Sequence, residues 1–222
     1  MNQLLAIVAI AVVGGAVVVV ASRDTRTVLL ALAVTLVATP LVADPLATPL
    51  GLAARLVGAI LATYLLWVVA RDRGIGESIA SPTGGSRIGW PAEVLIAAGA
   101  AVVGYAAHGL GAPADGPALA SAAGFAIAAL AVAPVATGHD VIRVGTGLLL
   151  LIDAALLVRA ALGGTPGDVE QLVTAAMLVV LAGSLAALAA NARGDGSGGY
   201  AFADPTRARV RREPDAHPLD QN

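Results

Sequence analysis

The sequence contains no cysteine and no lysine, and each absence excludes a kind of chemistry. Without cysteine the chain has no disulfide, no thiolate-bound iron–sulfur cluster or zinc ion, and no thiol nucleophile. Without lysine, the glycine-rich segments at 145–147 and 163–167 lack the basic residue of a phosphate-binding loop. Histidine is scarce as well, and His108, His139 and His217 do not have the spacing of metal ligands. The sequence therefore predicts no metal site, no bound cofactor and no catalytic residue.

Charged residues are also scarce, at 13% of 222 residues, whereas hydrophobic residues reach 58%. A soluble domain of this size does not need such an excess of apolar surface. Seven apolar runs approach the roughly 20 helical residues that cross a hydrocarbon core. They cover 3–22, 27–42, 50–70, 91–108, 117–137, 141–162 and 170–191. The sequence therefore predicts an all-α, polytopic integral membrane bundle with about seven transmembrane helices.

Basic residues follow alternate apolar runs, and this distribution predicts the topology. Arginines follow the first, third, fifth and seventh runs, whereas the connections 43–49, 109–116 and 163–169 contain none. Because arginines near membrane-spanning segments are retained in the cytoplasm, the N-terminus is predicted outside and the C-terminus in the cytoplasm. The first run exceeds the apolar region of a signal peptide and has no preceding basic residue, so we expect a retained helix.

Two polar segments divide the chain. The first, 72–90, is rich in Gly, Ser and Pro and is predicted to be a cytoplasmic loop. It separates the first three helices (1–71) from the last four (91–193), which together form one transmembrane domain over 1–193. The tail, 194–222, is rich in Gly, Pro and charge without an apolar period, and we expect it to be disordered in the cytoplasm. Similar helix endings are compatible with a parallel repeat of the first three and last three helices, but sequence rich in Ala, Leu and Val produces such matches easily.

Asp153 is the main candidate for chemistry, because it lies near the centre of the run 141–162. A carboxylate at the bilayer centre costs about 2.5–3.5 kcal/mol on insertion scales and is a functional candidate by default. Burial favours the neutral, protonated form unless a cation lies close. Asp153 is therefore a proton-relay candidate. The alternative is a neutral aspartic acid that is hydrogen-bonded to a Ser, a Thr or a backbone carbonyl of an adjacent helix.

Two arginines inside apolar runs are secondary candidates. Arg159 follows Asp153 by six residues and is rotated by about 240° around the helix, so the two cannot pair along one face. We expect Arg159 to snorkel to the outer surface or to meet Asp168 or Glu170 at the next helix start. Arg55 has the same two options, to snorkel to the surface or to meet Asp44, a nearby partner on the outer side, and we interpret both arginines as snorkelling side chains.

Glu93 is the third secondary candidate, two residues after Pro91 in the first turn of the predicted fourth helix. A carboxylate at this position stabilises the partial positive charge of a helix N-terminus. We therefore interpret Glu93 as a capping residue rather than a catalytic acid. Since the sequence contains no visible hydrolase triad, Walker motif or metal cluster, the chain by itself is not expected to be an enzyme.

Several short motifs occur in the order found in one family of membrane subunits. They are GPALA at 116–120, GHDVIR at 138–143, the helix that contains Asp153, and GDVE at 167–170. Together they resemble the C-terminal half of hydrogenase-4 component E, which is itself similar to the small K subunit of complex I and its antiporter relatives. RLVG at 55–58 and YLLWVVARD at 64–72 look like the third helix of that family. The resemblance covers most of residues 3–193.

The resemblance implies a membrane-arm subunit beside large antiporter-like subunits in a prokaryotic cytoplasmic membrane, where buried carboxylates form part of a lateral proton path. The K-type helix has a Glu about one turn before an Asn, at the positions of Leu149 and Asp153. Component E has Glu-Asn where this chain has Ile152 and Asp153. The second membrane Glu of the K subunit would fall within 179–185, which contains no acid. This departure leaves room for a purely architectural role.

Functions of different classes therefore compete. In the first, the chain is a non-catalytic subunit of a complex-I-like or group-4-hydrogenase-like complex that translocates protons or ions, with its redox centres in other subunits. In the second, it is a free-standing transporter or permease with a substrate site between the two three-helix units, where Asp153, Thr63 and Ser184 are the polar residues available. The third is a structural scaffold. The expected partners are large antiporter-like subunits, other complex subunits and the lipid bilayer, and we expect no nucleic acid.

Overall fold

The structure is a computed structural model, and it describes residues 3–22, 24–42, 48–71, 90–108, 110, 115–137, 141–164 and 166–194. Within these residues all regular structure is helical, so the predicted all-α class is confirmed for them. The elements are α1 (Gln3–Ala21), α2 (Thr25–Ala38), the 3-10 helix η1 (Thr39–Val42), α3 (Pro49–Arg71), α4 (Trp90–Ala107), α5 (Ala118–Thr137), α6 (Val141–Gly163) and α7 (Asp168–Gly194). The predicted loop and tail lie outside the described residues except for Trp90 and Gly194, as do Arg23, Asp44, His139 and His217.

Six helical segments within the described residues are long and apolar enough to cross a membrane, and α2 reaches that length together with η1. Large apolar side chains on their outward faces are uncovered: Leu4, Leu30 and Val180 are each more than two thirds exposed. Such surfaces suit contact with lipid. Helix α4 has 18 residues and is about 27 Å long, but it is not among these six segments, because its apolar part, Pro91–Ala107, is shorter. That α4 also crosses the membrane therefore stays a prediction. The chain is a multi-pass helical membrane protein.

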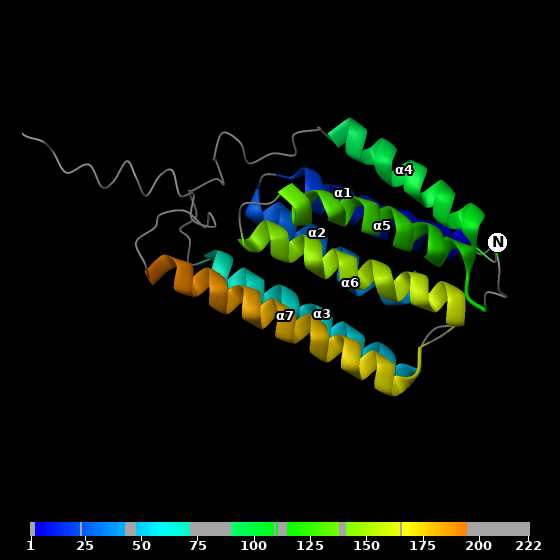
Figure 1. Ribbon diagram of the computed structural model, residues 1–222. Coiled ribbons are helices and arrows are strands. Elements are labelled where there is room, and N and C mark those ends of the chain that lie inside the picture. Colours follow the sequence, from blue (N-terminus) through cyan, green and yellow to red (C-terminus); the bar gives the residue numbers. More distant parts are fainter. Residues whose placement is uncertain are drawn as a thin grey trace, which may run out of the picture.

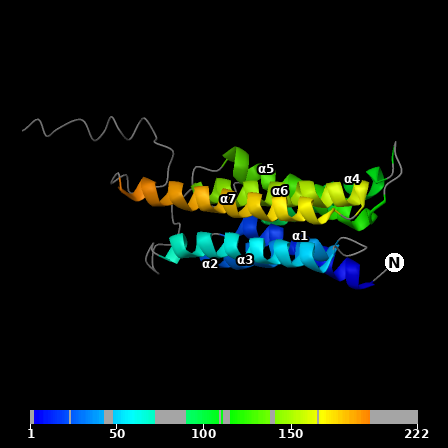
Figure 2. The ribbon, with the colours of Figure 1, turned by 90° about the horizontal axis from the view of Figure 1, so that it is seen from below.

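The helices form two layers. Figure 2 shows α1, α2 and α3 in one layer and α4, α5, α6 and α7 in the other. Consecutive helices run in alternating directions, so that the odd-numbered helices all begin at the same end of the bundle (Figure 1). We call this the Thr48 end and the opposite one the Arg71 end. Across the layers, α3 packs closely on α7 and α1 packs on α5.

Small residues set the closest approaches between helices. A Cβ atom added to Gly58 of α3 would lie 2.8 Å from Ala175 Cβ and 3.0 Å from Ala175 Cα of α7. Ser121 Oγ of α5 donates a hydrogen bond of 2.8 Å to the Gly104 carbonyl oxygen of α4. Close packing and interhelical hydrogen bonds of this kind hold helices together in lipid, where hydrophobic exclusion does not operate.

Asp24 caps the N-terminus of α2 at the Arg71 end. The Asp24 carboxylate accepts hydrogen bonds from the Thr27 hydroxyl and from the backbone N–H groups of Thr27 and Arg26. These bonds, with that of the Thr27 hydroxyl as the largest contribution, lower the pKa of Asp24 below its ordinary value of 3.8. A lowered pKa means that the carboxylate form stabilises the folded state above the ordinary value, and that this contribution is lost as the pH falls through the folded pKa.

Replacing Asp24 with alanine is therefore expected to lower the unfolding temperature in detergent near neutral pH, because the first turn of α2 loses its acceptor. The difference from the natural chain should shrink when both are measured below pH 3.8. Asp24→Asn is the matched control, because asparagine caps a helix without titrating. A difference that is equal at both pH values would rule out the carboxylate as its source.

Candidate functional site

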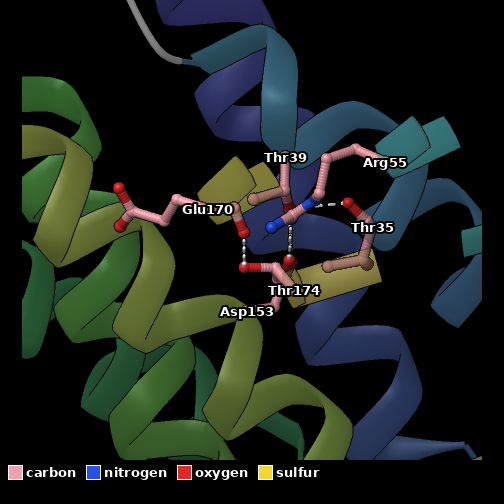
Figure 3. Close-up of polar contacts among 6 residues, drawn as sticks. All are labelled: Thr35, Thr39, Arg55, Asp153, Glu170 and Thr174. Atoms are coloured by element: carbon pink, nitrogen blue, oxygen red, sulfur yellow. Dashed lines mark hydrogen bonds and ion pairs between the residues drawn. The ribbon is translucent and has the colours of Figure 1, made fainter. Parts of the chain in front are cut away.

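An ion pair between Arg55 of α3 and Asp153 of α6 joins the two layers inside the bundle. Arg55 Nη2 donates a hydrogen bond to Asp153 Oδ1 over 3.1 Å. The two side chains are 4% and 0% exposed, and Figure 3 shows them directed toward one another. We call Arg55 and Asp153 the buried pair. Burial of both charges is tolerated only because each is hydrogen-bonded to the other.

The interpretation of Arg55 as a snorkelling residue is wrong. Its side chain is buried rather than extended to the surface, and its partner among the described residues is Asp153. The physical reason is position. Arg55 lies on the buried face of α3 between Gly51 and Gly58, and both of these glycines approach α7. From that face the nearest opposite charge lies across the layers, inside the bundle.

Thr39 adds a hydroxyl group to the site from the junction of α2 and η1. The apolar run 27–42 predicts one continuous helix, but α2 stops at Ala38 and continues as the 3-10 helix η1. Pro40 has no N–H group to donate to the carbonyl of Leu36, so the α-helical hydrogen bonds cannot continue through it. Thr39 itself keeps α-helical geometry, with its backbone N–H bonded to the Thr35 carbonyl, and its Oγ1 contacts Asp153 Oδ2 of α6. The hydroxyl partner predicted for Asp153 is therefore present, together with a nearby cation.

The Thr39 hydroxyl has two acceptors within reach but only one proton. Its Oγ1 contacts Asp153 Oδ2 and also lies 2.7 Å from the Thr35 carbonyl oxygen. If Asp153 is ionised, the hydroxyl can donate to only one of these acceptors at a time. If Asp153 is protonated, its own O–H donates to Thr39, which then donates to the Thr35 carbonyl. Proton uptake by Asp153 thus reverses one hydrogen bond and leaves the heavy atoms where they are.

Arg159 forms a second ion pair, at the Thr48 end. Arg159 Nη2 lies 3.2 Å from Glu170 Oε2, and the side chains are 46% and 36% exposed. One of the two predicted outcomes, a meeting with Glu170 at the start of the next helix, is therefore confirmed. The structure also separates Arg159 from Asp153, as the rotation of the helix predicts. This pair lies at the edge of the bundle, away from the buried pair.

Because both side chains are partly exposed, Arg159→Gln is expected to change the free energy of unfolding by less than about 1 kcal/mol. The measurement is equilibrium unfolding in mixed micelles, with Glu170→Gln as the reciprocal variant. A loss as large as that expected for a buried pair would show that Arg159 belongs to the structural core.

Glu93 lies in the first turn of α4, as predicted. Its side chain is only 3% exposed, and neither carboxylate oxygen has a hydrogen-bond partner among the described residues. The capping interpretation therefore rests on the position of Glu93 near the helix N-terminus, without the N–H contacts that a capping side chain usually accepts. No described contact connects Glu93 to the buried pair.

Other polar residues gather where α7 faces α3, and of these the sequence patterns singled out only Asp168. Gln171 and Thr174 are 5% and 6% exposed, and Thr48 Oγ1 donates a hydrogen bond to Asp168 Oδ1. Figure 3 shows Thr174, whose hydroxyl donates to the Glu170 carbonyl over 2.7 Å, together with the buried pair. The available signal was their helical spacing, because residues 168, 171 and 174–175 lie on one face of a helix.

Thr63 and Ser184 do not converge on the site. Thr63 Oγ1 donates to the Ala59 carbonyl of its own helix, and Ser184 Oγ lies within reach of the Val180 and Leu181 carbonyls of its own helix. Hydrogen bonds of this kind satisfy a hydroxyl in lipid without a partner from another helix. Within the described residues no three His, Cys, Asp or Glu side chains lie together in a way that suits a metal ion.

Comparison of the chain with protein-family models, with curated proteins and with solved structures found no match in any of the three. The functional argument therefore depends on the buried pair, on the membrane-spanning architecture and on the sequence motifs.

Proposed function

We propose that the chain is a non-catalytic membrane-arm subunit of a complex-I-like or group-4-hydrogenase-like complex that translocates protons or ions, and that Asp153 is a relay acid in it. The single observation that supports this most strongly is a buried carboxylate with an arginine guanidinium and a threonine hydroxyl as its partners. Acids deep within membrane-spanning helices are rare and mark proton relays and ion pathways.

The geometry suits proton exchange rather than substrate binding. Arg55 stabilises the ionised form of Asp153, and the Thr39 hydroxyl can serve either protonation state by reversing its hydrogen bond. Because both protonation states of Asp153 are hydrogen-bonded without a large rearrangement, Asp153 can accept a proton and then release it. A relay also needs further groups within hydrogen-bond reach or a chain of water molecules, and Asp153 alone does not supply these.

Neighbouring subunits would supply the missing groups. The K-type pattern expects a second acid within 179–185, and this chain has none there. Leu149, at the position of the K-type Glu, is completely buried among apolar residues. The proposed path therefore enters or leaves through large antiporter-like subunits that cover part of the apolar outer surface. The proposed topology has the N-terminus outside, seven spans and the C-terminus in the cytoplasm of a prokaryotic cell.

A free-standing transporter is the alternative, and one observation favours it. The buried pair lies between the layer of α1–α3 and the layer that contains α5–α7, which is where that function would put a substrate site. Against it, Thr63 and Ser184 are engaged within their own helices, which leaves few polar groups to bind a substrate.

The test is purification of the tagged chain from its native membrane in a mild detergent, followed by identification of the bound chains by mass spectrometry. The proposal predicts recovery of a large antiporter-like subunit at a constant ratio to the tagged chain. A tagged unrelated membrane protein, expressed at the same level, controls for adventitious association. Recovery of the chain alone, folded and monodisperse, would overturn the subunit proposal and favour the transporter.

A further inference from the structure

We infer that a polar seam between α3 and α7 admits water and protons from the Thr48 end of the bundle to the buried pair. The seam consists of Thr48, Asp168, Gln171 and Thr174. The inference rests on the proposed function and deepens it, because it assigns the side of the membrane from which Asp153 exchanges protons. Under the proposed topology this is the outside.

The mouth of the seam lies where α3 and α7 begin. Thr48 precedes α3, and its hydroxyl donates a hydrogen bond to Asp168 and accepts one of 3.2 Å from the Gly51 N–H, which caps α3. Glu170 lies nearby in the first turn of α7. Asp168 and Glu170 are partly or largely exposed, so the mouth is open to water and carries acidic groups.

The register of α3 against α7 carries the seam inward. A Cβ on Gly51 would lie 3.1 Å from Gln171 Cγ, so the Gln171 side chain packs directly on the backbone of α3. Arg55 follows Gly51 by one helical turn, and Thr174 follows Gln171 by one turn on the same face of α7. Arg55 and Thr174 therefore lie one helical turn farther from the Thr48 end than Gly51 and Gln171.

The seam ends next to Arg55 and Thr174, on the side that faces the Arg71 end. Gly58 and Ala175 are in such close contact that a Cβ on Gly58 would clash with the α7 backbone. Beyond them, toward the Arg71 end, the buried residues of both helices are apolar, and they include Ala62, Leu66 and Leu178. Along the buried faces of α3 and α7, polar residues thus lead from the Thr48 end to the buried pair and do not continue past it.

An unpaired donor at the inner end of the seam indicates a ligand there. Arg55 Nε is buried and has no hydrogen-bond partner among the described residues. The Arg55 side chain is only 4% exposed, so bulk solvent does not reach this N–H group. Buried N–H groups are almost always satisfied, by protein or by ordered water. A water molecule that reaches Arg55 would satisfy the Nε donor and would extend the hydrogen-bonded row toward Thr174.

The charges favour water and small cations over anions. The Asp168 carboxylate at the mouth repels anions, and the charge of the Arg55 guanidinium at the inner end is balanced by Asp153, so that a small cation can approach as far as Thr174. Gln171 and Thr174 offer both donors and acceptors, which suits a row of hydrogen-bonded water molecules.

The test measures access of Ag⁺, a small thiol-reactive cation, to single introduced cysteines in sealed native membrane vesicles of each orientation. The natural chain has no cysteine, so each variant has one reactive thiol. Thr174→Cys is the reporter. Val173→Cys, which is 53% exposed on the outer surface of the same helix, controls for access through lipid, and Leu178→Cys, which is 0% exposed, controls for the sealed region. The readout is protection of the thiol from maleimide labelling after denaturation.

The inference predicts that Ag⁺ reacts with Thr174→Cys about tenfold faster or more than with either control, since the reactive thiolate forms only where water reaches it. The reaction should occur only from the side that carries the Thr48 end. Equal rates at all three positions, or reaction only from the Arg71 end, would overturn it. If Thr174→Cys fails to fold, Gln171→Cys with Leu172→Cys as its lipid-facing control gives the same comparison. If the chain copurifies with a large subunit but Thr174→Cys does not react with Ag⁺, the seam is wrong and the subunit proposal stands. If Thr174→Cys reacts but the chain purifies alone, the subunit proposal is wrong and the seam stands.

Discussion

Replacing Asp153 with asparagine is expected to destabilise the folded chain by about 3–5 kcal/mol, the usual cost of removing one partner of a buried ion pair. The reason is that Arg55, only 4% exposed, would keep its charge without an anionic partner. Arginine does not lose its proton in proteins, so the charge cannot be neutralised. The measurement is reversible unfolding in mixed micelles with increasing denaturing detergent.

The reciprocal variants decide whether the ion pair is the cause. Arg55→Met should cost less than Asp153→Asn, because the remaining Asp153 can bind a proton and become neutral. The double variant Arg55→Met/Asp153→Asn should recover most of the lost stability, since it leaves no buried charge and the introduced amide can still accept a hydrogen bond from Thr39. Losses that simply add in the double variant would mean that the two residues do not interact in the folded chain.

Replacing Gly58 with alanine is expected to destabilise the fold by about 1–3 kcal/mol, the usual cost of extra volume in a packed interior. The added Cβ would lie 2.8 Å from Ala175 Cβ and 3.2 Å from its carbonyl oxygen. Because backbone atoms are involved, relief requires α3 to move away from α7. Such a shift would also displace Arg55, one turn away on α3, and loosen the buried pair.

Gly99→Ala is the matched control for Gly58→Ala. Gly99 also lies within a helix, but nothing lies within 4 Å of a Cβ at this position. The control should be neutral or stabilising by up to about 1 kcal/mol, because alanine is the better helix former. The same unfolding assay serves both variants. Equal effects of the two substitutions would indicate that the close approach of α3 and α7 does not limit stability.

The positions of the helices could be predicted from the sequence because apolar length and end signals act locally. The run 141–162 corresponds to Val141–Gly163, and the run 50–70 corresponds to Pro49–Arg71. The exception is the run 27–42, where Pro40 interrupts the α-helical hydrogen bonds and creates η1. The proline was visible in the sequence, whereas the position of Thr39 beside Asp153 depends on how α2 packs against α6.

The buried pair could not be predicted from periodicity. Arg55 and Asp153 are 98 residues apart in the chain, and their helices are apolar almost all round, so no stripe of polar residues marks the buried face. A signal was nevertheless present, because Arg55 and Asp153 are opposite charges well inside apolar runs and each is costly without a partner. Arg159 lies close to a helix end, where water and Glu170 are within reach.

The most direct test of the account is proton translocation by vesicles that contain the assembled complex, with the double variant Arg55→Met/Asp153→Asn compared with the natural chain. The double variant is expected to keep the fold without the titratable group, so it separates a relay from a structural role. The account predicts that the variant assembles with the same subunits but translocates protons about 10²-fold more slowly, the smaller of the usual effects of a positioned proton-transfer group. An assembled variant with an unchanged rate would contradict the relay and leave the pair as an architectural contact.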